Sequence, residues 1–152
     1  VNNTLLNVSL KTQIKPANEQ TRVYNGIKRH LFTPEKITSL NYDEVFVFGS
    51  NSEGMHWGGA ARTAYQHFGA IMGVSVGIQG QSYAIPTMEG DLESIRHFVN
   101  EFIQFARHNK HLFFFVTRIG CGFAGYTDNE IAPLFVAARN EENICLPKTF
   151  VS

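Results

Sequence analysis

Two glycine-rich segments carry the residues of this chain that point most directly to chemistry. The first, residues 49–60, reads GSNSEGMHWGGA, and the second, residues 118–126, reads RIGCGFAGY. Each follows an apolar run typical of a buried strand, Val45–Phe48 or Leu112–Val116, and each leads toward a segment of helix-forming residues. Where a glycine loop enters a helix, backbone N–H groups and the helix dipole converge and bind anions such as phosphate. The sequence therefore predicts two phosphate-binding loops.

Strands and helices are expected to alternate around these loops. Besides the two apolar runs, short strands are expected at residues 74–76, 82–87 and 144–146, and helices at residues 33–40, 60–68, 92–108 and 129–139. Thr33 followed by Pro34 is typical of a helix start. Asp91, and Thr127 or Asp128, are the expected caps of the last two helices. This alternation predicts an α/β domain with a mostly parallel central sheet. Because the carboxyl ends of parallel strands share one edge of a sheet, we expect both glycine loops to face one crevice.

The chain is expected to divide near residue 30. Residues 1–30 are predicted to form an N-terminal arm or edge strands, with candidate strands at residues 6–10 and 21–24. Residues 31–152 are predicted to form the domain. An alternative role for the arm is to mediate oligomerisation.

The composition argues against several classes of protein. Thirteen Lys and Arg residues balance thirteen Asp and Glu residues, so the formal net charge is zero, which disfavours extended contacts along a nucleic acid. No apolar run reaches the roughly 18 residues of a membrane span, and no signal peptide is recognisable. Cys121 and Cys145 fit no zinc template and are expected to be reduced thiols. We therefore expect a cytoplasmic protein that binds no membrane, metal or cofactor.

Four strings of the sequence carry a resemblance to a known family. FVFGSN, GGAARTAY, SYAIPT and FFFVTRIGCGFAGY together resemble the macrodomain, an ADP-ribose-binding module, and are similar to a divergent phage and bacterial branch of largely unassigned function. The resemblance covers residues 43–146 and implies a three-layer α/β/α fold. It also implies that Asn51 contacts the distal ribose and that two glycine loops hold the diphosphate. The residues expected to contact the ligand are Gly49, Ser50, Asn51, Trp57, Gly58, Gly59, Ala60, Arg118, Gly120, Cys121, Gly122, Phe123, Ala124, Gly125 and Tyr126.

Several of these residues have a second interpretation. Asn51 suits a turn as well as a ribose contact. Trp57 suits either an apolar lid on the domain or a stacking wall for a base or ribose. Phe123 and Tyr126 suit either the pocket wall or the core. Arg118 would pair with a phosphate or close the end of a strand.

Two residues offer a reactive group. His56 is either a general base or, more commonly for a loop histidine, a surface residue. Cys121 stands beside a predicted helix N-terminus, which can lower the pKa of a thiol; the alternative is a small apolar spacer. Asn51 is the one candidate catalytic residue of the ligand-binding set.

The function expected from these features is binding of ADP-ribose, a related nucleotide diphosphate or an ADP-ribosylated macromolecule. An enzymatic version would hydrolyse an ADP-ribosyl linkage with a water positioned beside Asn51. The alternative is a module that binds a nucleic-acid end or a modified nucleotide without catalysis.

Overall fold

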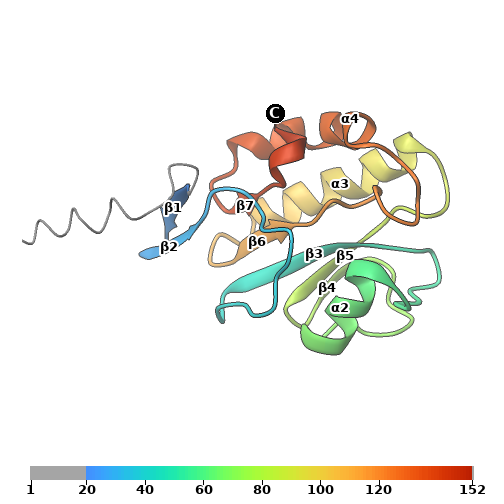
Figure 1. The fold of residues 1–152 in the computed structure, drawn as a ribbon, viewed down its shortest axis with the longest axis horizontal. Coiled ribbons are helices and arrows are strands. Elements are labelled where there is room, and N and C mark those ends of the chain that lie inside the picture. The colour runs from blue at the N-terminus through green and yellow to red at the C-terminus, as the bar shows by residue number, and fades with distance from the viewer. Residues whose placement is uncertain (1–19, 152) are drawn as a thin grey trace, which may run out of the picture.

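The computed structural model describes residues 20–151 and shows an α/β structure built on a five-stranded, mostly parallel sheet (Figure 1). The strands lie in the order β4–β5–β3–β6–β7. Their bounds are Glu44–Ser50 for β3, Gly77–Gln79 for β4, Ser82–Pro86 for β5, Phe113–Val116 for β6 and Ile144–Cys145 for β7. Only β4 runs antiparallel to its neighbour, and the other three pairings are parallel. The predicted α/β class with a mostly parallel sheet is confirmed.

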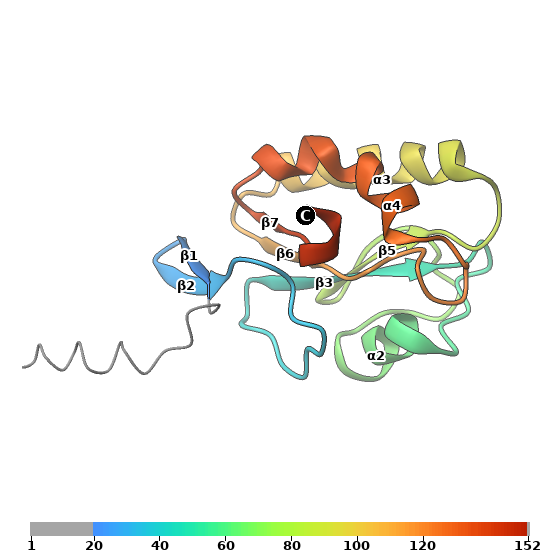
Figure 2. The ribbon, with the colours of Figure 1, turned by 45° about the horizontal axis from the view of Figure 1, so that its top comes forward.

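Helices cover both faces of this sheet (Figure 2). The helix α3 (Leu92–Arg107), the short helix α4 (Asp128–Ile131) and the following 3₁₀ helix η1 (Ala132–Asn140) lie on one face, and α2 (Gly59–His67) lies on the other. A 3₁₀ turn, η2 (Lys148–Phe150), ends the described chain. None of the described helices is long and apolar enough to cross a membrane.

The side chains of β3 show how one strand serves both faces. Successive side chains of a strand point to opposite sides of the sheet. Val45 and Val47 pack in the core beneath α3, whereas Phe46 and Phe48 pack against α2. All four are at most 4% exposed, so the uninterrupted apolar run predicted as a buried strand reflects cover on both faces.

The helix caps were predictable from the sequence. The Asp91 carboxylate accepts a hydrogen bond from Ser94 N–H at 3.0 Å and begins α3. Thr127 and Glu130 form a capping box at the start of α4. Both caps satisfy N–H groups that the first helical turn leaves without partners.

The prediction of a helix at residues 33–40 is wrong, and these residues form an irregular loop. Thr33 donates its N–H to Leu146 O at 2.9 Å and its hydroxyl to Cys145 O at 3.0 Å. The hydroxyl that would cap a helix therefore binds the edge of the sheet. Ile37 and Leu40 then pack on the α2 face of the sheet, so tertiary contacts outweigh the local helix-start signal.

The strand predicted at residues 74–76 is also wrong. The strand in this region is β4, which begins at Gly77, and residues 71–76 form a loop. The buried Gln79 side chain holds this loop by accepting from Ile71 N–H at 2.6 Å and donating to Val74 O at 3.1 Å. The bond to Val74 O uses a backbone group that a strand at 74–76 would have placed in the sheet.

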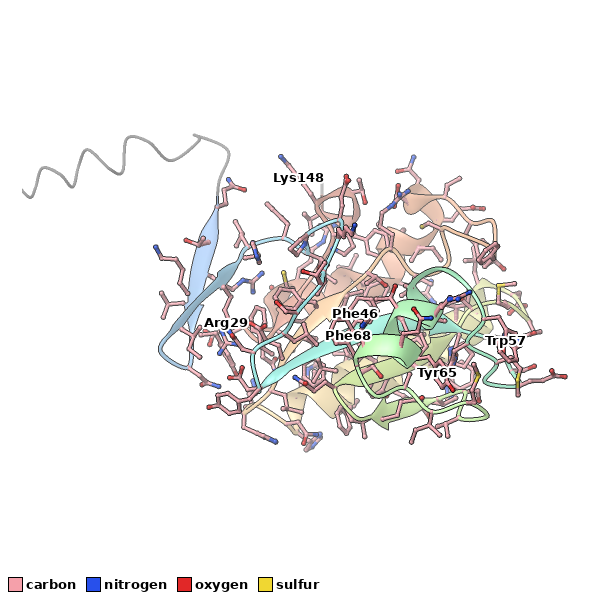
Figure 3. The ribbon with its side chains drawn as sticks, turned by 60° about the horizontal axis from the view of Figure 1, so that its bottom comes forward. Arg29, Phe46, Trp57, Tyr65, Phe68 and Lys148 are labelled. Carbon is pink, nitrogen blue, oxygen red and sulfur yellow. The ribbon has the colours of Figure 1, made fainter. Side chains whose placement is uncertain are left out.

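The described N-terminal residues form a hairpin of β1 (Thr21–Tyr24) and β2 (Ile27–His30). The strand predicted at residues 21–24 is confirmed, and the one predicted at 6–10 lies outside the described residues. Buried Arg29 joins the hairpin to the start of β3, because its guanidinium donates to both Asp43 oxygens at 2.9 Å and to Glu44 at 3.2 Å. This anchor lies at the end of the molecule opposite Trp57 (Figure 3).

Candidate functional site

The carboxyl ends of three adjacent parallel strands lie at one edge of the sheet. β3 pairs with β5 on one side and with β6 on the other. The chain leaves β3 toward α2 on one face, but it leaves β5 and β6 toward α3 and α4 on the opposite face. Connections that diverge in this way open a crevice at the strand ends, where open α/β sheets bind ligands.

A cavity of about 460 Å³, here called the crevice, occupies this position. Its walls come from the loops that follow β3, β5 and β6. The lining residues are Gly49, Gly58, Gly59, Ala60, Ala61, Thr87, Met88, Thr117, Arg118, Ile119, Gly120, Gly122, Phe123 and Ala124. The prediction that both glycine loops face one crevice is confirmed, and the volume lies within the roughly 300–1,000 Å³ of small-molecule sites.

The first glycine loop presents a helix N-terminus without a protein cap. Gly58 is the N-cap of α2 and offers no side-chain hydrogen bond, and the first turn holds no acidic residue. The N–H groups of Gly59, Ala60 and Ala61 have no partner within the helix, and all three residues line the crevice. Gly59 has φ of 59°, a left-handed conformation that favours glycine at this entry.

The second glycine loop folds back on itself and leaves further donors free. Tyr126 N–H donates to Gly120 O at 2.8 Å, and Gly125 N–H donates to Gly122 O at 3.0 Å. Within residues 20–151, the N–H groups of Gly120, Gly122, Phe123 and Ala124 make no hydrogen bond. Gly120 has φ of 77°, and a Cβ there would lie 2.8 Å from Ile131 Cδ1, so only glycine fits.

Among residues 20–151, Arg118 is the only charged residue that lines the crevice. Its Nε and Nη2 donate to the two oxygens of Asp128 at 3.0 and 2.8 Å. The hydrogen bond from Arg118 lowers the pKa of the Asp128 carboxyl, and the same bond raises the pKa of the guanidinium. Arg118 therefore does close the strand end onto α4, but its Nη1 makes no hydrogen bond in the described part of the chain. Arg118 can therefore offer one further donor to a ligand while its charge is paired with Asp128.

The crevice continues into a neighbouring cavity of about 280 Å³, here called the Trp57 hollow. The two share Gly49, Gly58, Ala61, Met88 and Phe123, and the hollow adds Ser50, Asn51, Met55 and Trp57. The Asn51 side chain accepts from Met55 N–H at 2.9 Å and donates to Met55 O at 3.0 Å. Asn51 thus has the role of a turn residue. Its contact with a ribose remains a prediction.

Some of the singled-out residues lie elsewhere. Cys121, Gly125 and Tyr126 line neither cavity, and Tyr126 packs against the core on the α3 face. His56 is completely buried, with its ring edge on Phe48 and Nε2 at 3.0 Å from Ile71 O. It is therefore not the surface residue considered from the sequence, and as a general base it would have to act from outside the lining of both cavities.

Cys121 does not have the environment of an activated thiol. Burial and the neighbouring Asp128 raise its pKa to about 11, so the lowered pKa considered from the sequence is wrong and the spacer interpretation is favoured. Cys145 is fully buried, and burial raises its pKa to about 11 as well. Both cysteines are free thiols.

Alkylation kinetics will check this assignment. A raised pKa keeps the thiol protonated, so at pH 8 Cys121 should hold about 100-fold less thiolate than a thiol of pKa 9.0. Because the more basic thiolate is the stronger nucleophile, Cys121 should react with iodoacetamide roughly 10-fold more slowly. The rate, followed by mass spectrometry with glutathione as reference, should still rise tenfold per unit up to about pH 10. A plateau above pH 9 would contradict the raised pKa.

The loop after β5 supplies two lining residues that the sequence analysis missed. Thr87 donates its N–H to Ser50 O at 2.9 Å, which ties this loop to the end of β3, and Met88 borders both cavities. The available signal was the predicted strand at residues 82–87, because its carboxyl end must share the edge used by the glycine loops.

Comparisons with protein-family models, with curated proteins and with solved structures find no match to this chain.

Proposed function

We propose that the crevice binds ADP-ribose or a related nucleotide diphosphate, and that the chain is a macrodomain-like module of three α/β/α layers. One observation carries the proposal: two separate groups of free backbone N–H donors line a single cavity that contains Arg118 and no carboxylate. The resemblance of residues 43–146 to macrodomains supports the same ligand class.

Two groups of donors in one cavity suit the two phosphates of a diphosphate. The N-terminus of α2 carries partial positive charge, which favours phosphate beside Gly59, Ala60 and Ala61. The second loop offers four N–H groups, those of residues 120 and 122–124, to the other phosphate. Backbone donors bind phosphate without a large net positive charge, consistent with a chain of zero formal charge.

Binding is the function that the site supports best. General acid–base catalysis needs a titratable side chain within reach of the substrate, and the described lining of the crevice holds no Asp, Glu or His. Hydrolysis with a water positioned by Asn51 remains a prediction. The Asn51 amide keeps one hydrogen and one lone pair beyond its bonds to Met55.

Calorimetry with ADP-ribose tests the proposal, and Arg118 provides the sharpest variant. Arg118→Gln removes a charge-assisted hydrogen bond to phosphate of about 1.5–3 kcal/mol, so the affinity should fall roughly 10- to 150-fold. Asp128→Asn is the matched control, because it keeps Arg118 and removes the competing carboxylate. That variant should bind equally well or more tightly.

Two results would count against ADP-ribose binding. If folded protein gave no heat of binding with millimolar ADP-ribose, the proposed binding would be contradicted. Tighter binding of a 5′-phosphorylated oligonucleotide than of ADP-ribose would favour the nucleic-acid-end alternative. A salt titration of that binding distinguishes one terminal contact from several, since the slope of log affinity against log salt grows with the number of phosphates contacted.

A further inference from the structure

The Trp57 hollow differs in chemistry from the crevice that it joins. The crevice contains free N–H donors and Arg118, whereas no charged residue lines the hollow in the described chain. Its side-chain walls are mainly Met55, Trp57, Met88 and Phe123. A ligand that spans both cavities therefore meets an anion site first and an apolar site next.

Three large apolar side chains stand exposed around this hollow, and each comes from a different loop. Trp57 is 69% exposed, Met88 is 44% exposed and Phe123 is 79% exposed. Neither the Trp57 nor the Phe123 ring pairs with another aromatic ring among residues 20–151. Figure 3 shows Trp57 at the periphery of the molecule, away from the core pair Phe46 and Phe68. Both side chains thus keep exposed ring surface that a ligand can cover.

The loops that carry these side chains are held together. Glu89 accepts a hydrogen bond from Ser52 N–H at 2.7 Å, which ties the loop of Met88 to the loop of Trp57. The ring of Phe123 lies over Gly58, since a Cβ on Gly58 would stand 2.9 Å from Phe123 Cε2. Phe123 therefore sits on the boundary between the crevice and the hollow. Walls held in this way lower the entropic cost of binding a rigid group.

We infer that the Trp57 hollow receives a flat ring at the second end of the ligand, so that the ligand is a dinucleotide diphosphate. This inference rests on the proposed function of the crevice. A ligand that ends in a ribose can reach Asn51 with its hydroxyl groups but leaves the exposed Trp57 and Phe123 side chains uncovered. A second ring covers them, and stacking of a base on an aromatic side chain contributes about 1–3 kcal/mol.

Titrations with ADP, ADP-ribose and nicotinamide adenine dinucleotide test the inference. Trp57 is the only tryptophan of the chain, so its fluorescence reports on the hollow, while calorimetry reports on total binding. The dinucleotide should bind about 5- to 150-fold more tightly than ADP-ribose. It should also change the Trp57 emission, and ADP should not.

Variants assign the difference to the hollow. Trp57→Ala, at an exposed position that borders only the hollow, should reduce the advantage of the dinucleotide and leave the affinity for ADP unchanged. Phe123→Ala should reduce that advantage as well. Tyr42→Ala is the matched control, because Tyr42 is 86% exposed and precedes the amino end of β3, at the far edge of the sheet. It should change neither affinity.

The outcomes separate the two levels of the proposal. Equal affinities for ADP-ribose and the dinucleotide, unchanged in Trp57→Ala, would overturn the inference and leave the proposed function intact. Failure of all three nucleotides to bind folded protein would overturn both. An effect of Trp57→Ala seen only with an ADP-ribosylated peptide would assign the hollow to the modified macromolecule and overturn the dinucleotide assignment.

Discussion

Replacing Gly58 by valine should abolish nucleotide binding while the protein remains folded. Gly58 has φ of −150° and ψ of 166°, an extended conformation that valine adopts readily. Its new side chain would begin 2.9 Å from Phe123 Cε2, in the space that both cavities border. We expect the affinity for ADP-ribose, measured by calorimetry, to fall at least about 100-fold, because the added branches occupy the position proposed for the diphosphate.

The Gly58→Val variant also changes a helix cap, and its control must do the same. Valine is a poor N-cap, so the free energy of unfolding should fall by about 1 kcal/mol. Asp91→Val removes the cap of α3 outside the lining of either cavity, and it should cost a similar free energy without changing the affinity. Wild-type affinity in folded Gly58→Val would show that the ligand does not use the crevice.

Replacing Arg29 by methionine should lower the free energy of unfolding by about 3–5 kcal/mol. The Arg29 side chain is fully buried and pairs with Asp43 and Glu44, whose side chains are 5% and 9% exposed. Its guanidinium also stacks on the Phe113 ring, 5.0 Å from the ring centroid. Methionine fills similar space but leaves two buried carboxylates without a counter-charge. Urea denaturation monitored by circular dichroism should show a midpoint shift without a change in slope.

Two further variants separate charge burial from loss of packing. Arg107→Met breaks the ion pair with Glu141 at a side chain that is 39% exposed, so it should cost less than about 1 kcal/mol. Adding Asp43→Asn and Glu44→Gln to Arg29→Met removes the unpaired charges and should recover much of the lost stability. If the Arg29→Met protein had the same urea midpoint as wild type, the buried cluster would not anchor the hairpin.

The Gly58→Val and Arg29→Met predictions concern two sites at opposite ends of β3. The cluster of Arg29, Asp43 and Glu44 lies at its amino end, and Gly49 at its carboxyl end enters the crevice. A folded, partly destabilised Arg29→Met protein should therefore still bind ADP-ribose with wild-type affinity. Function and anchoring are separable because the strand spans the sheet between them.

The sequence determined the elements whose signals are local. The buried β6 follows from a run of apolar residues, α3 from a helical apolar stripe that includes Ile95, Val99 and Phe102, and its start from the Asp91 cap. The convergence of the two glycine loops was predictable as well, because parallel strands bring their carboxyl ends to one edge. In each case neighbours in the chain, or the symmetry of a parallel sheet, decide the outcome.

Only the tertiary structure decided what depends on partners distant in the chain. Thr33 carries a local helix-start signal, yet its hydrogen bonds go to Leu146 and Cys145, more than a hundred residues away. His56 and Trp57 are adjacent, and packing alone buries the first and exposes the second. The two glycine-rich stretches were thus identifiable as parts of one site, and their binding of phosphate stays a prediction. The division of the site into a crevice lined by backbone N–H donors and an aromatic hollow required the fold, because Phe123 and Gly58 meet only in three dimensions.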